Sequence, residues 1–174
     1  MKQIRNNVLL IDGYNIINAW GDLAKIAGDN LEEARRLFND KISEYAQYNG
    51  IDTYIVYDAY KVRGVSDREE KIKKLTIIFT KENQTADSYI EKFIHDYKYK
   101  RHAMIRVATN DLTEQNMVLG KGAARLTARE LLLEVEQSKE SIRRIIKEGS
   151  ENRYTLGQRL DKETFDKLEK LRRS

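Results

Sequence analysis

Four short apolar runs constrain the fold of this chain more than any other feature of its sequence. They lie at residues 8–11, 53–57, 75–79 and 103–108, and they are rich in β-branched and aromatic residues. None of them alternates strictly between apolar and polar positions, a pattern typical of parallel strands that are covered on both faces. A fifth, weaker strand is predicted at residues 123–126.

Helical patterns lie between several of these runs. Asn30 and Glu33 resemble a capping box, and apolar residues then recur at helical spacing. A second apolar stripe follows Thr85, and Thr127 with Glu130 forms a further capping box. Strands that alternate with helices predict an α/β fold of the Rossmann-like kind, with a central, mostly parallel sheet of four to five strands flanked by helices.

The last fifth of the chain differs from the rest in charge. Residues 139–174 hold 11 basic and 7 acidic side chains, whereas residues 1–138 hold 21 of each, so the net charge of +4 belongs to this end. We expect one domain over residues 1–148, a polar connector at residues 149–157, and a short basic helix from Asp161 that packs on the same domain. A basic surplus permits a polyanionic partner, although it also favours solubility.

Several classes of function are excluded by what the sequence lacks. The 174 residues include no cysteine, which excludes disulfides and thiolate sites. Neither a P-loop nor a G-x-G-x-x-G motif is present, so no nucleotide cofactor is expected. No segment is apolar for long enough to be a signal peptide or a membrane span, which predicts a cytoplasmic protein with no membrane partner. We expect His95 and His102 to be surface residues, which argues against a zinc site.

Acidic residues follow the predicted strands at their carboxyl ends, where open parallel sheets bind their ligands. Asp12 and Asp58 directly follow the first two strands, Glu82 and Asp111 come three residues after later ones, and Asp87 lies in a predicted first helical turn. Carboxylates that converge on one edge repel each other unless a cation or protons compensate. Oxygen ligands suit Mg²⁺ or Mn²⁺, which can activate water for attack on a phosphodiester.

Each of these acids also has a plainer interpretation. An aspartate after a strand often serves only as a turn or cap residue, and one in a first helical turn favours the helix dipole. Asp12 is the strongest candidate for a functional acid, because it ends an apolar run within the segment Asp-Gly-Tyr-Asn, where Gly13 lets the backbone turn sharply.

Four ordered motifs together make the chain resemble a known family. They are residues 8–15, an apolar run that ends in Asp-Gly-Tyr-Asn; residues 80–87, Thr-Lys-Glu-Asn-Gln-Thr-Ala-Asp; residues 108–115, Ala-Thr-Asn-Asp-Leu-Thr-Glu-Gln; and residues 122–131, Gly-Ala-Ala-Arg-Leu-Thr-Ala-Arg-Glu-Leu. Over about residues 7–137 the chain resembles the YacP-like NYN-domain proteins, which are PIN-like ribonucleases of bacteria.

The resemblance implies a PIN/NYN fold and a metal-dependent endoribonuclease. Asp12, Asp87 and Asp111 match the metal-binding acids of the family, and Asn15 matches the asparagine that orients the site. The wider PIN group usually carries a second acid two residues after the first one of the third motif. Thr113 stands there in this chain, so Glu114 is a candidate substitute and the number of metals stays open. The family also implies action on messenger RNA in association with the ribosome.

The resulting hypothesis assigns roles to further residues. Mg²⁺ or Mn²⁺ is held by Asp12, Asp87 and Asp111 with Asp58 nearby, Asn15 and Asn110 orient the acids, and cleavage leaves a 5′-phosphate and a 3′-hydroxyl. Bases are expected to stack on Tyr14 or Tyr60. Basic residues on segments that border the acidic edge are expected to contact RNA phosphates: Lys61, Arg63, Lys81, Lys121, Arg125 and Arg129.

Two other classes of function are open to a chain with this pattern. One is a non-catalytic RNA- or ribosome-binding module, which would gain nothing from clustered acids. The other is an aspartyl phosphatase or phosphoacceptor, which also places an aspartate after its first strand. The second class fits poorly, because Tyr14 stands where a phosphatase would carry its second aspartate and Thr80 where a receiver would carry its phosphoacceptor.

Overall fold

A six-stranded sheet forms the centre of the computed structural model, which describes residues 6–61, 67–97 and 103–172. The strand order is β3-β4-β2-β1-β5-β6, and every pairing is parallel except that of β3 with β4. The α/β fold with a mostly parallel sheet is therefore confirmed. The strands are β1 (Asn6–Asp12), β2 (Asp52–Tyr57), β3 (Arg68–Ile72), β4 (Leu75–Phe79), β5 (Ala103–Ala108) and β6 (Ala124–Leu126).

Strand β3 is the one strand that the sequence does not predict. Its sequence is Arg-Glu-Glu-Lys-Ile, all five residues are exposed, and it pairs only with β4, at the edge of the sheet. A strand that buries no face carries no apolar run by which it could be predicted. Charged side chains on an edge strand also discourage pairing with other chains.

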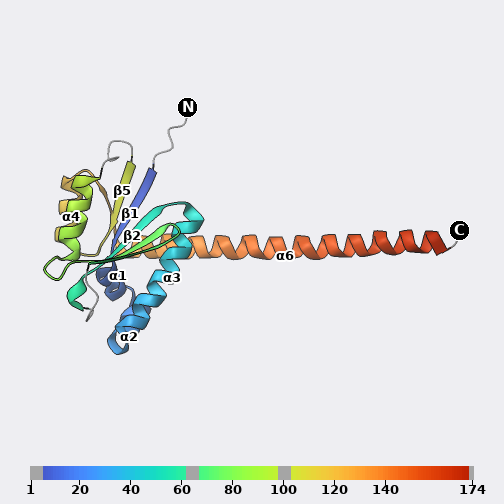
Figure 1. The fold of residues 1–174 in the computed structure, drawn as a ribbon, viewed down its shortest axis with the longest axis horizontal. Coiled ribbons are helices and arrows are strands. Elements are labelled where there is room, and N and C mark those ends of the chain that lie inside the picture. Colours follow the sequence, from blue (N-terminus) through green and yellow to red (C-terminus); the bar gives the residue numbers. More distant parts are fainter. Residues whose placement is uncertain (1–5, 62–66, 98–102, 173–174) are drawn as a thin grey trace. The chain divides into compact units, whose positions relative to one another are not determined.

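Helices cover both faces of the sheet (Figure 1). On one face, Leu9 and Ile11 of β1 pack with Phe38 and Ile42 in the cluster that includes the helices α1 (Gly13–Ala19), α2 (Gly21–Asp29) and α3 (Leu31–Asn49). On the other face, the alternate residues Val8 and Leu10 pack against α4 (Ala86–Asp96) and α5 (Leu112–Gly120). Successive side chains of a strand point to opposite faces, so β1 contributes to both cores. A short 3₁₀ turn, η1 (Ala59–Lys61), follows β2.

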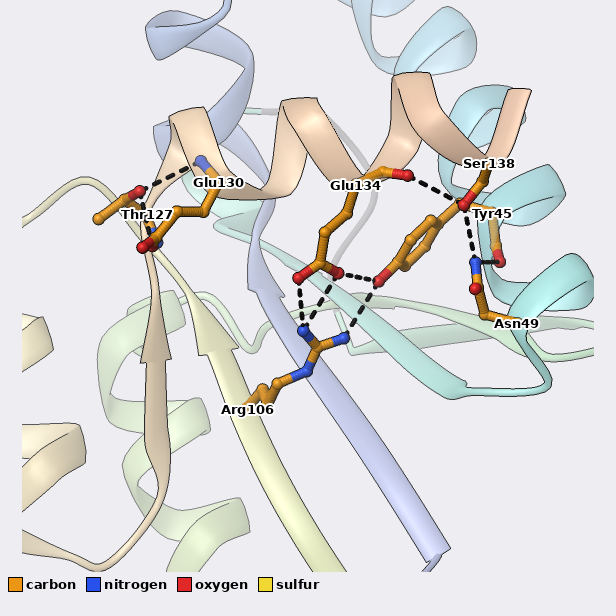
Figure 2. A network of polar contacts seen from close by, with 7 residues as sticks. All are labelled: Tyr45, Asn49, Arg106, Thr127, Glu130, Glu134 and Ser138. Atoms are coloured by element: carbon orange, nitrogen blue, oxygen red, sulfur yellow. Dashed lines mark hydrogen bonds and ion pairs between the residues drawn. The ribbon is translucent and has the colours of Figure 1, made fainter. Parts of the chain in front are cut away.

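The start of helix α6 (Ala128–Arg172) is fixed to β5 and α3 by a polar network (Figure 2). Arg106 of β5 forms an ion pair with Glu134 of α6 at 2.8 Å, and the hydroxyl of Tyr45 donates to the same carboxylate. Burial raises the pKa of Tyr45 to about 12, and the hydrogen bond to Glu134 adds to the rise. The hydroxyl therefore stays protonated and remains a donor.

The predicted capping box at the start of α6 is also present. The N–H of Thr127 donates to Glu130 Oε2 at 2.7 Å, and the N–H of Glu130 donates to Thr127 Oγ1 at 3.2 Å (Figure 2). These two bonds satisfy two of the N–H groups that the first turn of a helix leaves without partners.

The connector predicted at residues 149–157 is wrong, because helix α6 runs without interruption from Ala128 to Arg172. Gly149 and Gly157 each cost a helix about 1 kcal/mol relative to alanine. The glutamate, arginine, leucine and glutamine around them favour helix, and the chain contains no proline to break it. The chain divides into two compact units, residues 1–138 and residues 139–174, and the second consists of the later part of α6.

No helix within the described part of the chain combines the length and the apolar character that crossing a membrane requires.

Candidate metal centre

Asp12 ends β1 at the carboxyl edge of the sheet and begins helix α1. Its side chain is only 8% exposed, and its Oδ1 accepts a hydrogen bond from the N–H of Asn15 at 3.2 Å. The next residue must be glycine, because a Cβ at Gly13 would lie 2.2 Å from Cε1 of Tyr57. The chain therefore turns from strand into helix with Asp12 held at the turn.

Asp87 lies in the first turn of α4, where Thr85 caps the helix by accepting from the N–H of Ser88. The position of this helix is fixed from β2, because Asp58 Oδ1 accepts from the N–H of Ala86 at 2.6 Å. Burial raises the pKa of Asp87, and the negative charges of Asp111 and Asp58 add to the rise. Asp58 thus holds the start of α4 in place, and its negative charge disfavours the ionised form of Asp87.

Glu114, in the first turn of α5, completes a group of three carboxylates. One carboxylate oxygen from each of Asp12, Asp87 and Glu114 lies within 4.8 Å of the other two. We call these three residues the acid trio. They come from three segments that are distant in the sequence. Strands β1 and β5 are neighbours in the sheet, and α4 packs over both.

The side chain of Glu114 is unusual among the described residues. It is 3% exposed, and both of its oxygens are buried without a hydrogen-bond partner, the only side-chain atoms in this condition among those described. Burial raises the pKa of Glu114 to about 8, and the charges of Asp12, Asp87 and Asp111 contribute, while the neighbouring Thr109 side chain opposes the rise only in part. A buried carboxylate without donors calls for a cation or a proton.

The donor set of the acid trio fits a hard divalent cation. It offers carboxylate oxygens, which Mg²⁺ and Mn²⁺ prefer, and no nitrogen or sulfur ligand belongs to the group. The partner-free oxygens of Glu114 are the atoms that such a cation would satisfy.

Asp111, a metal ligand by prediction from the sequence, lies outside the acid trio. Its Oδ1 caps helix α5 by accepting from the N–H groups of Thr113 at 2.7 Å and Glu114 at 3.3 Å. It stands close enough for its charge to raise the pKa of both Asp87 and Glu114. The structure thus brings Glu114, the suggested substitute, into the position where a third ligand is needed.

Asn15 lies where an orienting residue would lie. Its Oδ1 accepts from the N–H of Asn110 at 2.6 Å, which ties α1 to the loop that leads into α5. Glu82, by contrast, is exposed and is not part of the acid trio.

Three of the basic residues predicted to contact RNA bind polar partners within the protein. Lys81 pairs with Asp67 at 3.9 Å, Lys121 pairs with Glu91 at 3.0 Å, and Arg125 donates to Gln115 at 2.9 Å. Arg129 is exposed. Arg63 and the side chain of Lys61 lie outside the described residues.

Of the two tyrosines expected to stack on bases, Tyr14 cannot do so in this structure. It is 2% exposed, its ring packs on Tyr57 with centroids 4.8 Å apart, and its hydroxyl accepts from Arg35. The Asp-Gly-Tyr-Asn segment turns into helix α1, and that turn directs the ring into the core. Tyr60, at 68% exposed, remains accessible. His95 is exposed beside Asp96, as expected, and His102 lies outside the described residues.

The family model of the YacP-like NYN domain matches residues 9–173. The Bacillus subtilis protein YacP is 38% identical over 167 residues, which cover 96% of this chain and 97% of that protein. The crystal structure of Rae1 (YacP) from Bacillus subtilis has a TM-score of 0.74 at 38% identity, with 96% of this chain and 95% of that one covered. The crystal structure of a mutant of Rae1 has a TM-score of 0.69 at 40% identity over 81% of each chain. The chain belongs to the YacP-like NYN domain family, a family of nucleases.

Proposed function

We propose that the protein is a metal-dependent endoribonuclease whose Mg²⁺ or Mn²⁺ is held by Asp12, Asp87 and Glu114. The observation that carries this proposal is the buried, partner-free carboxylate of Glu114 within 4.8 Å of two further acids. A non-catalytic RNA-binding module would gain nothing from such an arrangement, because clustered acids with a buried member destabilise a fold.

A bound divalent cation would lower the pKa of water and offset the charge that develops on the phosphate during in-line attack. The protein's own residues prepare the site for it. Glu114 holds a proton near neutral pH in the absence of a cation and releases it when a cation binds. The bonds from Asp12 to Asn15, and from Asn15 to Asn110, keep the segments that carry the acids in a fixed arrangement.

The substrate of the proposed enzyme is RNA, and specifically messenger RNA on translating ribosomes. Support comes from the family relationship and from the basic residues Lys81, which follows β4, and Arg125 and Arg129, which lie in β6 and at the start of α6. The surplus of 11 basic over 7 acidic residues in 139–174 would add sequence-independent attraction to ribosomal RNA.

The decisive experiment compares Glu114→Gln with Glu82→Gln, a matched control at an exposed glutamate. Cleavage of RNA is measured with and without Mn²⁺, and the ends are mapped. We expect Glu114→Gln to lose cleavage by at least about a hundredfold, Glu82→Gln to retain it, and the wild-type products to carry a 5′-phosphate and a 3′-hydroxyl. Unchanged cleavage by Glu114→Gln would remove the proposed metal centre.

The ribosome partner needs its own measurement. We expect the wild-type protein to co-sediment with ribosomes at low salt and to cut messenger RNA faster when it is being translated. RNA cleavage that translation does not accelerate would exclude the ribosome while leaving the nuclease proposal intact. RNA binding with no cleavage in any divalent cation would instead favour the binding module.

A further inference from the structure

A groove lies on the face of the sheet that α4 covers, and none of the acid trio lines it. Helix α4 packs through Ile90 and Ile94 over β1, β2 and β5, whereas β4 and the edge strand β3 extend beyond it. Between the helix and these two strands is a groove of about 960 Å³. We call it the α4 groove; its lining includes Ile78, Gln84, Tyr89, Lys92, Phe93 and Tyr97.

One wall of the α4 groove is aromatic. Tyr89, Phe93 and Tyr97 follow one another at intervals of four residues, so they line the same side of α4. The rings of Phe93 and Tyr97 are stacked with centroids 5.3 Å apart, and Tyr54 of β2 packs on Phe93 at 4.9 Å. All three wall residues are partly exposed, so ring surface remains available to a ligand.

The rest of the lining is polar and electrically balanced. Asn83 and Gln84 contribute amide groups, which can both donate and accept hydrogen bonds. The charged lining residues are three acids and three bases: Asp67, Glu69, Asp96, Arg68, Lys81 and Lys92. A lining with no net charge does not suit a run of phosphates. Flat rings with amide groups beside them suit an uncharged aromatic ligand.

The α4 groove is bordered by the loop that leads to Asp87, a member of the acid trio. Gln84 lies three residues before Asp87, and the loop between β4 and α4 is bonded at both ends to the residues that directly follow β2. Thr80 Oγ1 accepts from the N–H of Ala59, and Asp58 accepts from the N–H of Ala86. The same segment therefore borders the groove and leads into the helical turn that carries Asp87.

We infer that the α4 groove binds an unpaired nucleobase of the RNA chain close to the bond that is cleaved. Single-stranded nucleic acids are commonly bound by stacking of bases on aromatic side chains, with amide groups reading the base edges. This inference rests on the proposed function for the identity of the ligand. It goes beyond that function by assigning a place for the base, apart from the acids and the surrounding lysines and arginines.

The test measures binding without cleavage. Tyr89→Ala and Gln84→Ala are compared with wild type for binding of a short single-stranded RNA, by fluorescence anisotropy in metal-free buffer. The control variant is Tyr48→Ala, at an exposed tyrosine on α3 that is not part of the groove lining. A second oligonucleotide of the same length has abasic sites in place of its bases. Thermal melting of each variant confirms that it is folded.

We expect Tyr89→Ala to weaken binding of the normal RNA by about tenfold, and Tyr48→Ala to leave it unchanged. The abasic strand should bind wild type and Tyr89→Ala equally, because it has no bases to stack. Equal affinity of folded Tyr89→Ala and wild type for the normal RNA would overturn the inference, as would an equal loss on the abasic strand. A change in self-association without a change in RNA binding would assign the groove to a second copy of the chain and would also overturn it.

Cleavage assays on the same variants separate this inference from the proposed function. With Mn²⁺ present, Gln84→Ala should shift the distribution of cut sites. If the wild-type protein binds bases in the groove but cuts no RNA, the nuclease proposal fails and the groove remains. If the wild-type protein cuts RNA, and the groove variants bind and cut RNA as the wild type does, the groove inference is wrong and the nuclease proposal stands.

Discussion

The side chain of Asn15 accepts a hydrogen bond from the backbone N–H of Asn110, at 2.6 Å and across 95 residues of sequence. The bond joins the first turn of α1 to the loop after β5. Asp12 also accepts from the N–H of Asn15, so one residue connects an acid of the trio to the segment that leads to Glu114. In the proposed site these two bonds make Asn15 a positioning residue.

Replacement of Asn15 tests this positioning role. We expect Asn15→Ala to lower kcat for RNA cleavage by about 10- to 100-fold, the usual cost of losing a residue that supports metal ligands. KM should change little. Asn15→Asp keeps an oxygen acceptor for Asn110 and should recover most of the lost thermal stability. A large rise in KM with unchanged kcat would contradict positioning and favour direct contact with RNA.

The raised pKa of Glu114 predicts how stability depends on pH. Burial holds this pKa near 8 in the folded protein, whereas an ordinary glutamate in the unfolded chain titrates near 4.5. Between these values the folded state binds more protons than the unfolded state, so the free energy of unfolding should fall as pH rises from about 5 to 8. Urea denaturation in metal-free buffer across this range would measure the fall.

Two controls accompany the pH experiment. Glu114→Gln cannot ionise, so its stability should vary less over the same range. Added Mn²⁺ should stabilise the wild-type protein most at the higher pH, since a cation competes with the proton for the carboxylate. If the stability of Glu114→Gln varied with pH as that of the wild type does, the carboxyl group of Glu114 would not be the cause of the pH dependence.

Asp111 offers a way to separate a cap from a metal ligand. Asparagine caps a helix about as well as aspartate, whereas alanine costs about 1 kcal/mol. We expect Asp111→Asn to keep its stability and to bind Mn²⁺ within a fewfold of wild type by calorimetry, and Asp111→Ala to be less stable. If Asp111→Asn abolished Mn²⁺ binding as Asp12→Asn should, Asp111 would be a ligand in the loaded protein.

The polar network at the start of α6 predicts an asymmetric response to mutation. Glu134→Ala should cost about 2 kcal/mol, because it leaves the partly buried guanidinium of Arg106 without its ion pair. Replacing both partners, as Arg106→Met with Glu134→Leu, should recover part of that loss. The free energies of unfolding of the wild type, Glu134→Ala and the double variant provide the measurement. A double variant less stable than Glu134→Ala would contradict this account.

The sequence predicted most of the elements that bury apolar side chains, but not the short helices α1 and α2. Strands β1, β2, β4 and β5 are indicated by apolar runs, and α3 and α4 by helical stripes. Strand β3 and helix α5 are not, because β3 is charged and exposed and two of the buried residues of α5, Glu114 and Gln115, are polar.

The site was predicted as far as the acids follow strand ends. Asp12 and Asp87 were placed from their positions relative to strands and helices. Glu114 was suggested only as a substitute, because sequence cannot show whether a glutamate is buried or exposed. Asp111 and Glu114 lie three residues apart in one helical turn. The direction of each side chain determines that Asp111 caps α5 while Glu114 joins the acid trio, and only the folded chain shows these directions.

The close packing of Gly13 against β2 couples position 13 to two residues of that strand, Ile55 and Tyr57. No side chain fits at position 13 while the ring of Tyr57 lies 2.2 Å from where its Cβ would stand. A larger residue there would displace the end of β2 and, with it, Asp58 and the start of α4. Because Cγ2 of Ile55 would lie 2.9 Å from the same Cβ, any larger residue at 13 has to be accompanied by changes that make room at both 55 and 57.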